Sequence, residues 1–203
     1  MFDAALMPMS QRLLQPLARR AASFGATADS ITILGFVIGV LAVPALALGY
    51  WSIALLLILL NRLCDGLDGA VARATKPTDR GAYLDIALDF TFYALVPLGF
   101  ALADPQDNAL AAAVLITSFI GTGSSFLAFA AVAGRRGDTA AAFPRKGIYY
   151  LGGLTEGFET IVVLVLMCLF PAHFPTIAYI FAAACAVTTV LRWRQGWVAF
   201  GAR

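Results

Sequence analysis

Long apolar stretches separated by short polar connections run through most of this chain. A helix that crosses a bilayer needs about 20 mostly apolar residues. Six stretches approach or reach that length, and we predict one transmembrane helix for each: Ile31–Tyr50, Trp51–Leu63, Ala82–Ala103, Ala109–Ala133, Ile148–Phe170 and Phe174–Leu191. The pattern therefore predicts an all-α membrane protein with six transmembrane helices.

The first 30 residues follow a different pattern. Apolar residues recur at helical spacing from residue 2 to residue 17, with arginines among them and just after them. This spacing predicts an amphipathic helix on the cytoplasmic membrane surface. Asp29 or Ser30 is a suitable N-cap for the first membrane helix. We therefore divide the chain into a juxtamembrane segment, residues 1–30, and a six-helix transmembrane domain, residues 31–203.

The composition supports the membrane assignment. Apolar residues make up 61% of the 203 residues and charged residues 13%, whereas soluble domains have roughly 45–50% and about 25%. A soluble domain, a disordered chain and a nucleic-acid binder are therefore excluded, and the net charge of +2 is too small for polyanion binding. Cys64, Cys168 and Cys185 lie in apolar runs without ligand-like spacing, so we expect buried thiols and neither a disulfide nor a zinc site.

Positive charge falls on one side of the predicted helices. All 14 Lys and Arg residues lie before the first helix, in or beside the second and fourth connections, or after the sixth helix. The other three connections contain none. Cytoplasmic loops carry such an excess of Lys and Arg. We therefore predict that both termini face the cytoplasm, in the inner membrane if the source is bacterial.

Four aspartates gather at the cytoplasmic ends of the second and third predicted helices. Asp65 and Asp68 are three residues apart, Asp85 and Asp89 are four apart, and each pair therefore shares one helix face. Intramembrane acids are costly and point to function. Converging carboxylates favour a hard cation such as Mg²⁺ or Mn²⁺. Ion pairs of Asp65 with Arg62 and of Asp68 with Arg73 are the alternative explanation.

The same segment resembles the signature of the CDP-alcohol phosphotransferases, also called CDP-alcohol phosphatidyltransferases. Eight positions between residues 65 and 89 match it: Asp65, Asp68, Gly69, Ala72, Arg73, Gly81, Asp85 and Asp89. The motif spans 25 residues, and the six-helix layout extends the resemblance to almost the whole chain.

The resemblance implies an activity and a role for each matching residue. Members transfer a phosphatidyl or similar group from CDP-diacylglycerol or a related CDP-linked lipid to an alcohol and release CMP. It implies that Asp65, Asp68, Asp85 and Asp89 bind Mg²⁺ or Mn²⁺, with two ions expected, and that Asp89 is also the general base. The CDP group would be bound by Asp65, Asp68, Gly69, Ala72, Arg73 and Gly81. The family resemblance also implies a homodimer.

The acceptor is a polar alcohol that the sequence does not identify. Basic residues between the fourth and fifth helices would suit an acceptor phosphate, or they reflect topology and anionic lipid attraction alone. They are Arg135, Arg136, Arg145 and Lys146. Glu156 and Glu159 share a face near the start of the fifth helix. They either line an acceptor pocket or pair with other polar groups.

Two other classes use acids within a membrane. Intramembrane prenyltransferases have Asp-rich magnesium sites, but the pattern of that class is repeated Asn-Asp-x2-Asp motifs on a longer bundle of about nine spans. In an ion or metal transporter, we would expect polar groups along a path through the bilayer. The six spans and the clustering of acids at one surface favour the phosphotransferase.

Overall fold

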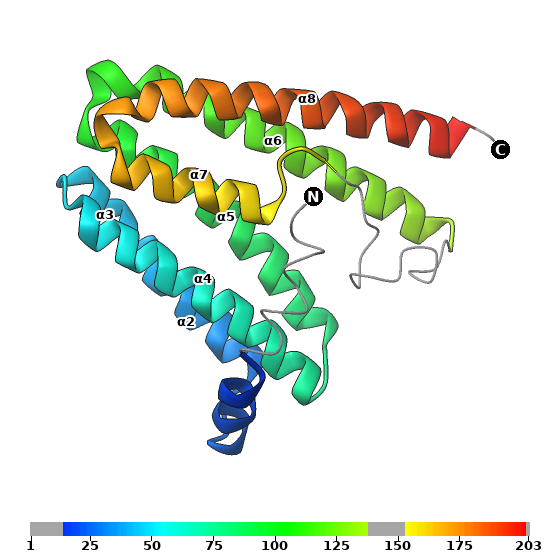
Figure 1. The fold of residues 1–203 in the computed structure, drawn as a ribbon. Coiled ribbons are helices and arrows are strands. Elements are labelled where there is room, and N and C mark those ends of the chain that lie inside the picture. Colours follow the sequence, from blue (N-terminus) through cyan, green and yellow to red (C-terminus); the bar gives the residue numbers. More distant parts are fainter. Residues whose placement is uncertain (1–13, 138–152, 202–203) are drawn as a thin grey trace.

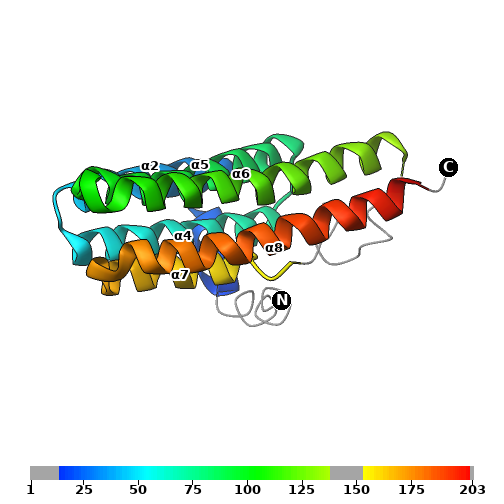
Figure 2. The same cartoon turned by 90° about the horizontal axis from the view of Figure 1, so that it is seen from above.

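A bundle of antiparallel and parallel helices makes up the chain in its computed structural model, which describes residues 14–137 and 153–201. Within those residues the regular elements are all helices. They are α2 (Ala28–Val40), α3 (Ala42–Ala47), α4 (Trp51–Ala74), α5 (Asp79–Ala103), α6 (Pro105–Arg135), α7 (Gly157–Leu169), a 3-10 turn (Pro171–His173) and α8 (Phe174–Gly201). Viewed from above, α2, α5 and α6 form one layer and α4, α7 and α8 the other (Figure 2).

The all-α prediction is confirmed, and four segments are long and apolar enough to cross a membrane: Ala28–Ala47, Asp79–Ala103, Pro105–Arg135 and Pro171–Gly201. The helix α4 is also 24 residues long, but its second half carries the charged motif. Its helical course continues 11 residues beyond the predicted end at Leu63. The acids at 65 and 68 therefore lie on a helix.

The first predicted helix is not continuous. It is divided into α2 and α3 at Leu41, and Pro44 lies in the first turn of α3. A proline ring has no N–H and collides with the carbonyl four residues earlier, here that of Val40, so the helix breaks. The predicted caps are also wrong. Because α2 begins at Ala28, Thr27 is the N-cap, and its hydroxyl accepts from the backbone N–H of Ser30.

The fifth predicted helix begins later than expected. Residues 153–156 are not helical, and α7 starts at Gly157 with Glu156 as its N-cap. The prediction of a helix from residue 148 is therefore wrong over 153–156, while 148–152 lie outside the described residues. With 13 residues, α7 is about 20 Å long, which is shorter than the hydrocarbon core of a bilayer.

The juxtamembrane segment is helical over residues 14–23, and this part packs on the bundle (Figure 1). Ala18 is fully buried in a small apolar cluster with Ile31 of α2 and with Ala70 and Val71 of α4. Leu17 points outward and is 47% exposed. Part of the predicted amphipathic helix thus packs against α2 and α4. Residues 1–13 lie outside the described residues.

An aromatic stack closes the end of the bundle remote from the acids. The ring of Phe100 in α5 stacks on Trp51 of α4 at 5.5 Å and on Phe174 of α8 at 4.4 Å between centroids. Phe100 and Phe174 are fully buried. Asp65 lies 14 residues along α4 from Trp51, or about 21 Å. The packing that joins three helices is therefore spatially separate from the polar site.

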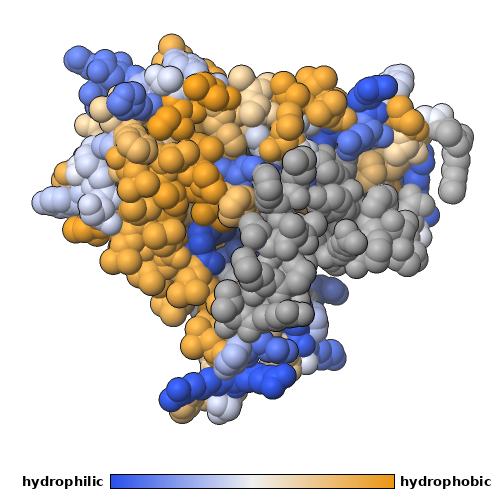
Figure 3. All heavy atoms as spheres, in the orientation of Figure 1, coloured by the Kyte–Doolittle hydropathy of each residue, from blue (hydrophilic) through white to orange (hydrophobic). Residues whose placement is uncertain are grey.

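Much of the outer surface remains apolar. Large exposed side chains include Leu41, Leu48, Leu56 and Ile180. Figure 3 shows hydrophobic side chains gathered over α3, α4 and α7, with hydrophilic ones below them where the helical residues 14–23 lie. A soluble protein rarely exposes so extensive an apolar surface, and lipid is the environment that suits it.

Glycines let α2 lie very close to α4 and α5. A Cβ on Gly35 would be 2.6 Å from Cys64 Cβ, and one on Gly39 would be 2.8 Å from the Phe92 ring. The two glycines are four residues apart, so they form a small-residue face that allows close helix packing. Through this contact, the backbone of α2 becomes one wall of the polar site.

We predict that Gly35→Ala lowers the stability of the protein by about 1–3 kcal/mol, the usual cost of an overpacked contact. The clash is with a Cβ, which no rotamer change can move. Thermal unfolding in detergent measures the effect. Gly134→Ala in α6 is the matched control, since a Cβ there meets nothing within 4 Å. An equal loss in both variants would contradict the packing argument.

Candidate active site

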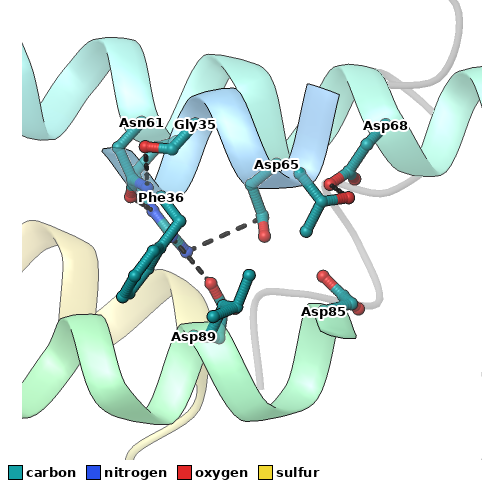
Figure 4. Close-up of a pocket in the computed structure, with 10 residues that line it drawn as sticks. Gly35, Phe36, Asn61, Asp65, Asp68, Asp85 and Asp89 are labelled. Carbon is teal, nitrogen blue, oxygen red and sulfur yellow. Dashed lines mark hydrogen bonds and ion pairs between the residues drawn. The ribbon is translucent and has the colours of Figure 1, made fainter. Parts of the chain in front are cut away.

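The four aspartates of the motif line one pocket at the junction of α2, α4 and α5. Asp65 and Asp68 come from the last turns of α4, and Asp85 and Asp89 from the first turns of α5. A short connection joins these helices, so their faces oppose each other (Figure 4). The pocket is completed by Thr32, Gly35, Phe36, Asn61, Arg62 and Leu88. The structure thus brings together the two pairs that the spacing placed on helix faces.

Three of the carboxylates form the tightest group. One oxygen from each of Asp65, Asp85 and Asp89 lies within 4.8 Å of the other two. Asp68 lines the same pocket, but it is 5% exposed and accepts a hydrogen bond from the Thr32 hydroxyl of α2. The site therefore contains a group of three close oxygens and a fourth acid fixed beside it.

A buried arginine borders this group. The Arg62 side chain is 9% exposed, and its Nη2 donates to Asp89 Oδ1 at 2.7 Å. Its Nη1 lies 3.7 Å from Asp65 Oδ2. The alternative explanation by an Arg62–Asp65 ion pair is thus partly correct, but the shorter contact joins Arg62 to Asp89 on the neighbouring helix.

Arg62 is itself held by Asn61, a buried residue that the sequence analysis did not select. Asn61 Oδ1 accepts from Arg62 Nε at 2.7 Å, and Asn61 Nδ2 donates to the Gly35 carbonyl at 2.8 Å. Polar residues facing a bundle interior are the signal that could have indicated this role. The hydrogen-bond chain links the backbone of α2 through α4 to the acid on α5.

The donor set fits a hard divalent cation. Carboxylate oxygens are the protein ligands that Mg²⁺ and Mn²⁺ prefer. Three of them are close enough to one another to bind the same ion. The formal charges of these three carboxylates and of Arg62 add to −2, which one divalent ion would neutralise. Asp65, Asp85 and Asp89 are the described residues best placed to hold it.

The other motif residues lie nearer the ends of α4 and α5. The guanidinium of exposed Arg73 folds back toward Gly69, where its Nη1 would be 3.1 Å from a Cβ. Among the described residues Arg73 forms no ion pair with Asp68, the alternative that we considered; Asp68 instead accepts from Thr32. Ala72 is half-buried on the same turn of α4.

Gly81 lies beside an ion pair that joins the starts of α2 and α5. Arg80 Nη2 is 2.6 Å from Asp29 Oδ2, and a Cβ on Gly81 would be 3.1 Å from Asp29 Oδ1. Asp29, expected to be a helix cap, instead connects two helices. Its carboxylate keeps the first turn of α5 close to α2.

The residues proposed for the acceptor are dispersed in the described structure. Arg135 and Arg136 end α6, and Arg136 donates to the carbonyls of Ala199 and Phe200, which ties α6 to α8. Glu156 and Glu159 form a reciprocal capping box at the start of α7. None of these four lines the carboxylate pocket. Arg145 and Lys146 lie outside the described residues.

Comparison with known proteins identifies the class to which this fold and site belong. The family model described as CDP-alcohol phosphatidyltransferase matches residues 26–191. The chain is 54% identical over 198 residues to the inner membrane protein YnjF of Escherichia coli, covering 98% of this chain and 96% of that protein. It is 34% identical over 98 residues to the archaetidylinositol phosphate synthase of Pyrococcus horikoshii, covering 48% and 52%.

Solved structures show the same fold. The phosphatidylinositol phosphate synthase PgsA1 of Mycobacterium tuberculosis with CDP-DAG bound superposes with a TM-score of 0.77 at 22% identity, covering 92% of this chain and 94% of that one. Its complex with manganese and citrate gives a TM-score of 0.68 at 25% identity, covering 91% and 88%.

The bundle is therefore that of an integral membrane transferase of phospholipid synthesis. More particularly, the chain belongs to the CDP-alcohol phosphatidyltransferase family, as the motif indicated. The family match decides among the three classes considered from the sequence, against the prenyltransferase and the transporter.

We predict that Asn61→Leu reduces both stability and transferase activity. The substitution leaves the Gly35 carbonyl and Arg62 Nε without the partners they now have, at a cost of about 1–3 kcal/mol for each buried polar group. Asn108→Leu is the matched control, because Asn108 is another buried asparagine that donates to a carbonyl, that of Phe100, at 3.0 Å. Thermal unfolding should show a loss in both variants. Activity at a temperature where both remain folded should fall only in Asn61→Leu, and an equal fall in both would contradict a role at the site.

Proposed function

We propose that this protein transfers a phosphatidyl or similar substituted phosphate group from CDP-diacylglycerol, or a related CDP-linked lipid, to a polar alcohol and releases CMP. The observation that carries the proposal is the group of three carboxylate oxygens within 4.8 Å, formed by Asp65, Asp85 and Asp89 of the family motif. The relation to PgsA1, which has been solved with CDP-DAG and with manganese, supports the choice of donor and metal.

Asp65, Asp68, Asp85 and Asp89 are the proposed metal-binding residues, with Mg²⁺ or Mn²⁺ as the ion and two ions expected. Bound metal would neutralise charge on the diphosphate, which is the main requirement of phosphoryl transfer. The protein's own contribution is to fix the carboxylates in position: Thr32 holds Asp68, and Arg62 holds Asp89.

Asp89 is also the proposed general base. Its Oδ1 accepts from Arg62, and its Oδ2 lies 3.5 Å from the Tyr93 hydroxyl. The side chain is 28% exposed, so an acceptor hydroxyl can reach it from the pocket. A base must lie within hydrogen-bond reach of the proton it removes, and the orientation fixed by Arg62 would supply that geometry.

The proposed CDP site adds Gly69, Ala72, Arg73 and Gly81 to Asp65 and Asp68. Arg73 is exposed and has a planar set of donors suited to a phosphate. The small residues at 69, 72 and 81 leave room for a nucleotide to approach the helix backbones. Because α4 ends and α5 begins at the same side of the bundle, these residues would bind CDP at the membrane surface, while the lipid tails would remain in the membrane.

Acceptor recognition is proposed for the cytoplasmic ends of α6 and α7. Arg135, Arg136, Arg145 and Lys146 would attract an acceptor phosphate. Glu156 and Glu159 would favour hydroxyl or amino groups from the start of α7, in addition to capping it. Two relatives are named as synthases of inositol-phosphate lipids, so inositol phosphate belongs in any acceptor panel.

We further propose six transmembrane passes, with both termini and the site in the cytoplasm, and a homodimer. The pair α2–α3 and the helices α4, α5, α6, α7 and α8 would be these six passes. Basic residues at one end of these passes support the orientation. Small residues on the helices permit close packing between two copies, which crosslinking in native membranes can test.

The enzymatic proposal predicts CMP release that requires both a divalent metal and an acceptor. Purified protein is incubated with CDP-diacylglycerol, Mg²⁺ or Mn²⁺ and a panel of alcohols that includes serine, glycerol 3-phosphate and inositol phosphate, and the lipid product is identified by its mass. Asp89→Asn should lower the rate by about 10²–10⁴-fold, the usual contribution of a general base. Asp107→Asn, an exposed acid at the start of α6, is the matched control. Full activity in Asp89→Asn would refute the mechanism.

The topology predicts opposite labelling at the two ends of the bundle. Cysteines are introduced singly at Gln106, at the start of α6, and at Lys76, between α4 and α5; both positions are exposed. A maleimide that does not cross membranes, added to intact spheroplasts, should label the Gln106→Cys variant and not the Lys76→Cys variant. In inverted vesicles the labelling should reverse. Labelling of Lys76→Cys in spheroplasts would overturn the orientation.

A further inference from the structure

Arg62 lies one helical turn before Asp65 and outside the family motif, yet it is a deeply buried cation beside the carboxylates. Its side chain is 9% exposed, against 34% for Asp65 and 28% for Asp89. Burying a cation is costly unless it is paired and hydrogen-bonded. The contacts of Arg62 therefore indicate what this charge does in the site.

The guanidinium is fixed on every side that the structure describes. Nε donates to Asn61, Nη1 to the Tyr93 hydroxyl at 3.1 Å, and Nη2 to Asp89. Its Cζ also lies 4.8 Å from the centre of the Phe92 ring and 5.3 Å from that of Tyr93, within the range of cation–π attraction. A side chain held in this way is a fixed part of the pocket wall, and it does not need to be ordered by a ligand.

We propose that Arg62 is a built-in counter-cation of the carboxylate cluster, which positions Asp89 and lowers the affinity of the cluster for divalent metal. This inference rests on the proposed function, since it concerns the same metal site. One Asp89 oxygen accepts from Arg62, the other lies 3.5 Å from the Tyr93 hydroxyl, and the side chain lines the pocket. Arg62 is thus a positioning residue, and its guanidinium is a fixed positive charge beside Asp65 and Asp89.

Two consequences follow from the charge. Without metal, Arg62 offsets part of the repulsion among Asp65, Asp85 and Asp89, so the cluster is preformed. With metal, the fixed positive charge repels the ion. A cluster from which the charge of Arg62 is removed should therefore be less stable alone and should bind metal more tightly.

The test is Mn²⁺ titration of the full-length protein in detergent, followed by electron paramagnetic resonance of the free ion. Arg62→Gln removes the charge, and Arg62→Lys retains it. Arg194→Gln removes an exposed arginine of α8 and controls for net charge. We expect Arg62→Gln to bind Mn²⁺ about tenfold more tightly, the effect of one nearby unit charge on a divalent ion. Arg62→Lys and Arg194→Gln should bind like the wild type.

Thermal unfolding gives a second measurement that does not depend on activity. Arg62→Gln should unfold at a lower temperature than the wild type without metal, and Mn²⁺ should raise its midpoint by more than it raises that of the wild type. Unchanged or weaker Mn²⁺ binding by folded Arg62→Gln would overturn the inference. An absence of Mn²⁺ binding to the wild type would instead overturn the proposed metal site itself, so the two failures are distinguishable.

Arg62→Lys tests whether Arg62 positions Asp89. This test remains available if Arg62→Gln does not fold. Lysine keeps the charge but cannot bond Asn61, Tyr93 and Asp89 together, because it lacks the planar set of donors. At saturating Mn²⁺ we expect kcat to fall at least tenfold while Mn²⁺ affinity stays close to that of the wild type. An unchanged kcat would show that Arg62 does not position Asp89.

Discussion

Mutual repulsion among carboxylates is the constraint around which this bundle is organised. Asp65, Asp85 and Asp89 place three oxygens within 4.8 Å, in a chain that is otherwise 61% apolar. Like charges at this distance destabilise a fold unless cations or hydrogen bonds offset them. The Arg62 guanidinium offsets part of this repulsion, the Thr32 hydroxyl stabilises the adjacent Asp68, and a divalent metal would provide further compensation.

The apolar part of the bundle makes these compensations possible. Gly35 and Gly39 allow α2 to approach α4 so closely that the Gly35 carbonyl can anchor Asn61, which in turn holds Arg62. At the opposite end, the stacked rings of Trp51, Phe100 and Phe174 join α4, α5 and α8. This aromatic packing lies away from the polar end, which carries charged groups that would weaken an ordinary core.

Placement at the end of the helices also suits a reaction between a lipid and a water-soluble molecule. A lipid donor would keep its tails in the hydrocarbon region, and its charged head group would lie at the level where α4 ends and α5 begins. The short connection between these helices presents both carboxylate pairs at that level. A site at the bilayer centre would instead require the diphosphate to lose its hydration at much greater cost.

The sequence by itself determined the helical class, the faces on which the acids lie and the family. These properties follow from local spacing: residues three or four apart share a helix face whatever the helix packs against. Local spacing also misled where a single residue changes the backbone. Pro44 divides the first predicted helix, and residues 153–156, which we predicted to be helical, precede α7 with Glu156 as its N-cap.

Only the tertiary structure decided which groups meet across helices. Asp89 rather than Asp65 is the closer partner of Arg62, Asp29 joins α2 to α5 through Arg80, and Thr32 holds Asp68. These contacts depend on the distance and rotation between neighbouring helices, which are set by the small residues and rings packed between them. The sequence could therefore place the charges on their helices, but the packing decided how those charges are balanced.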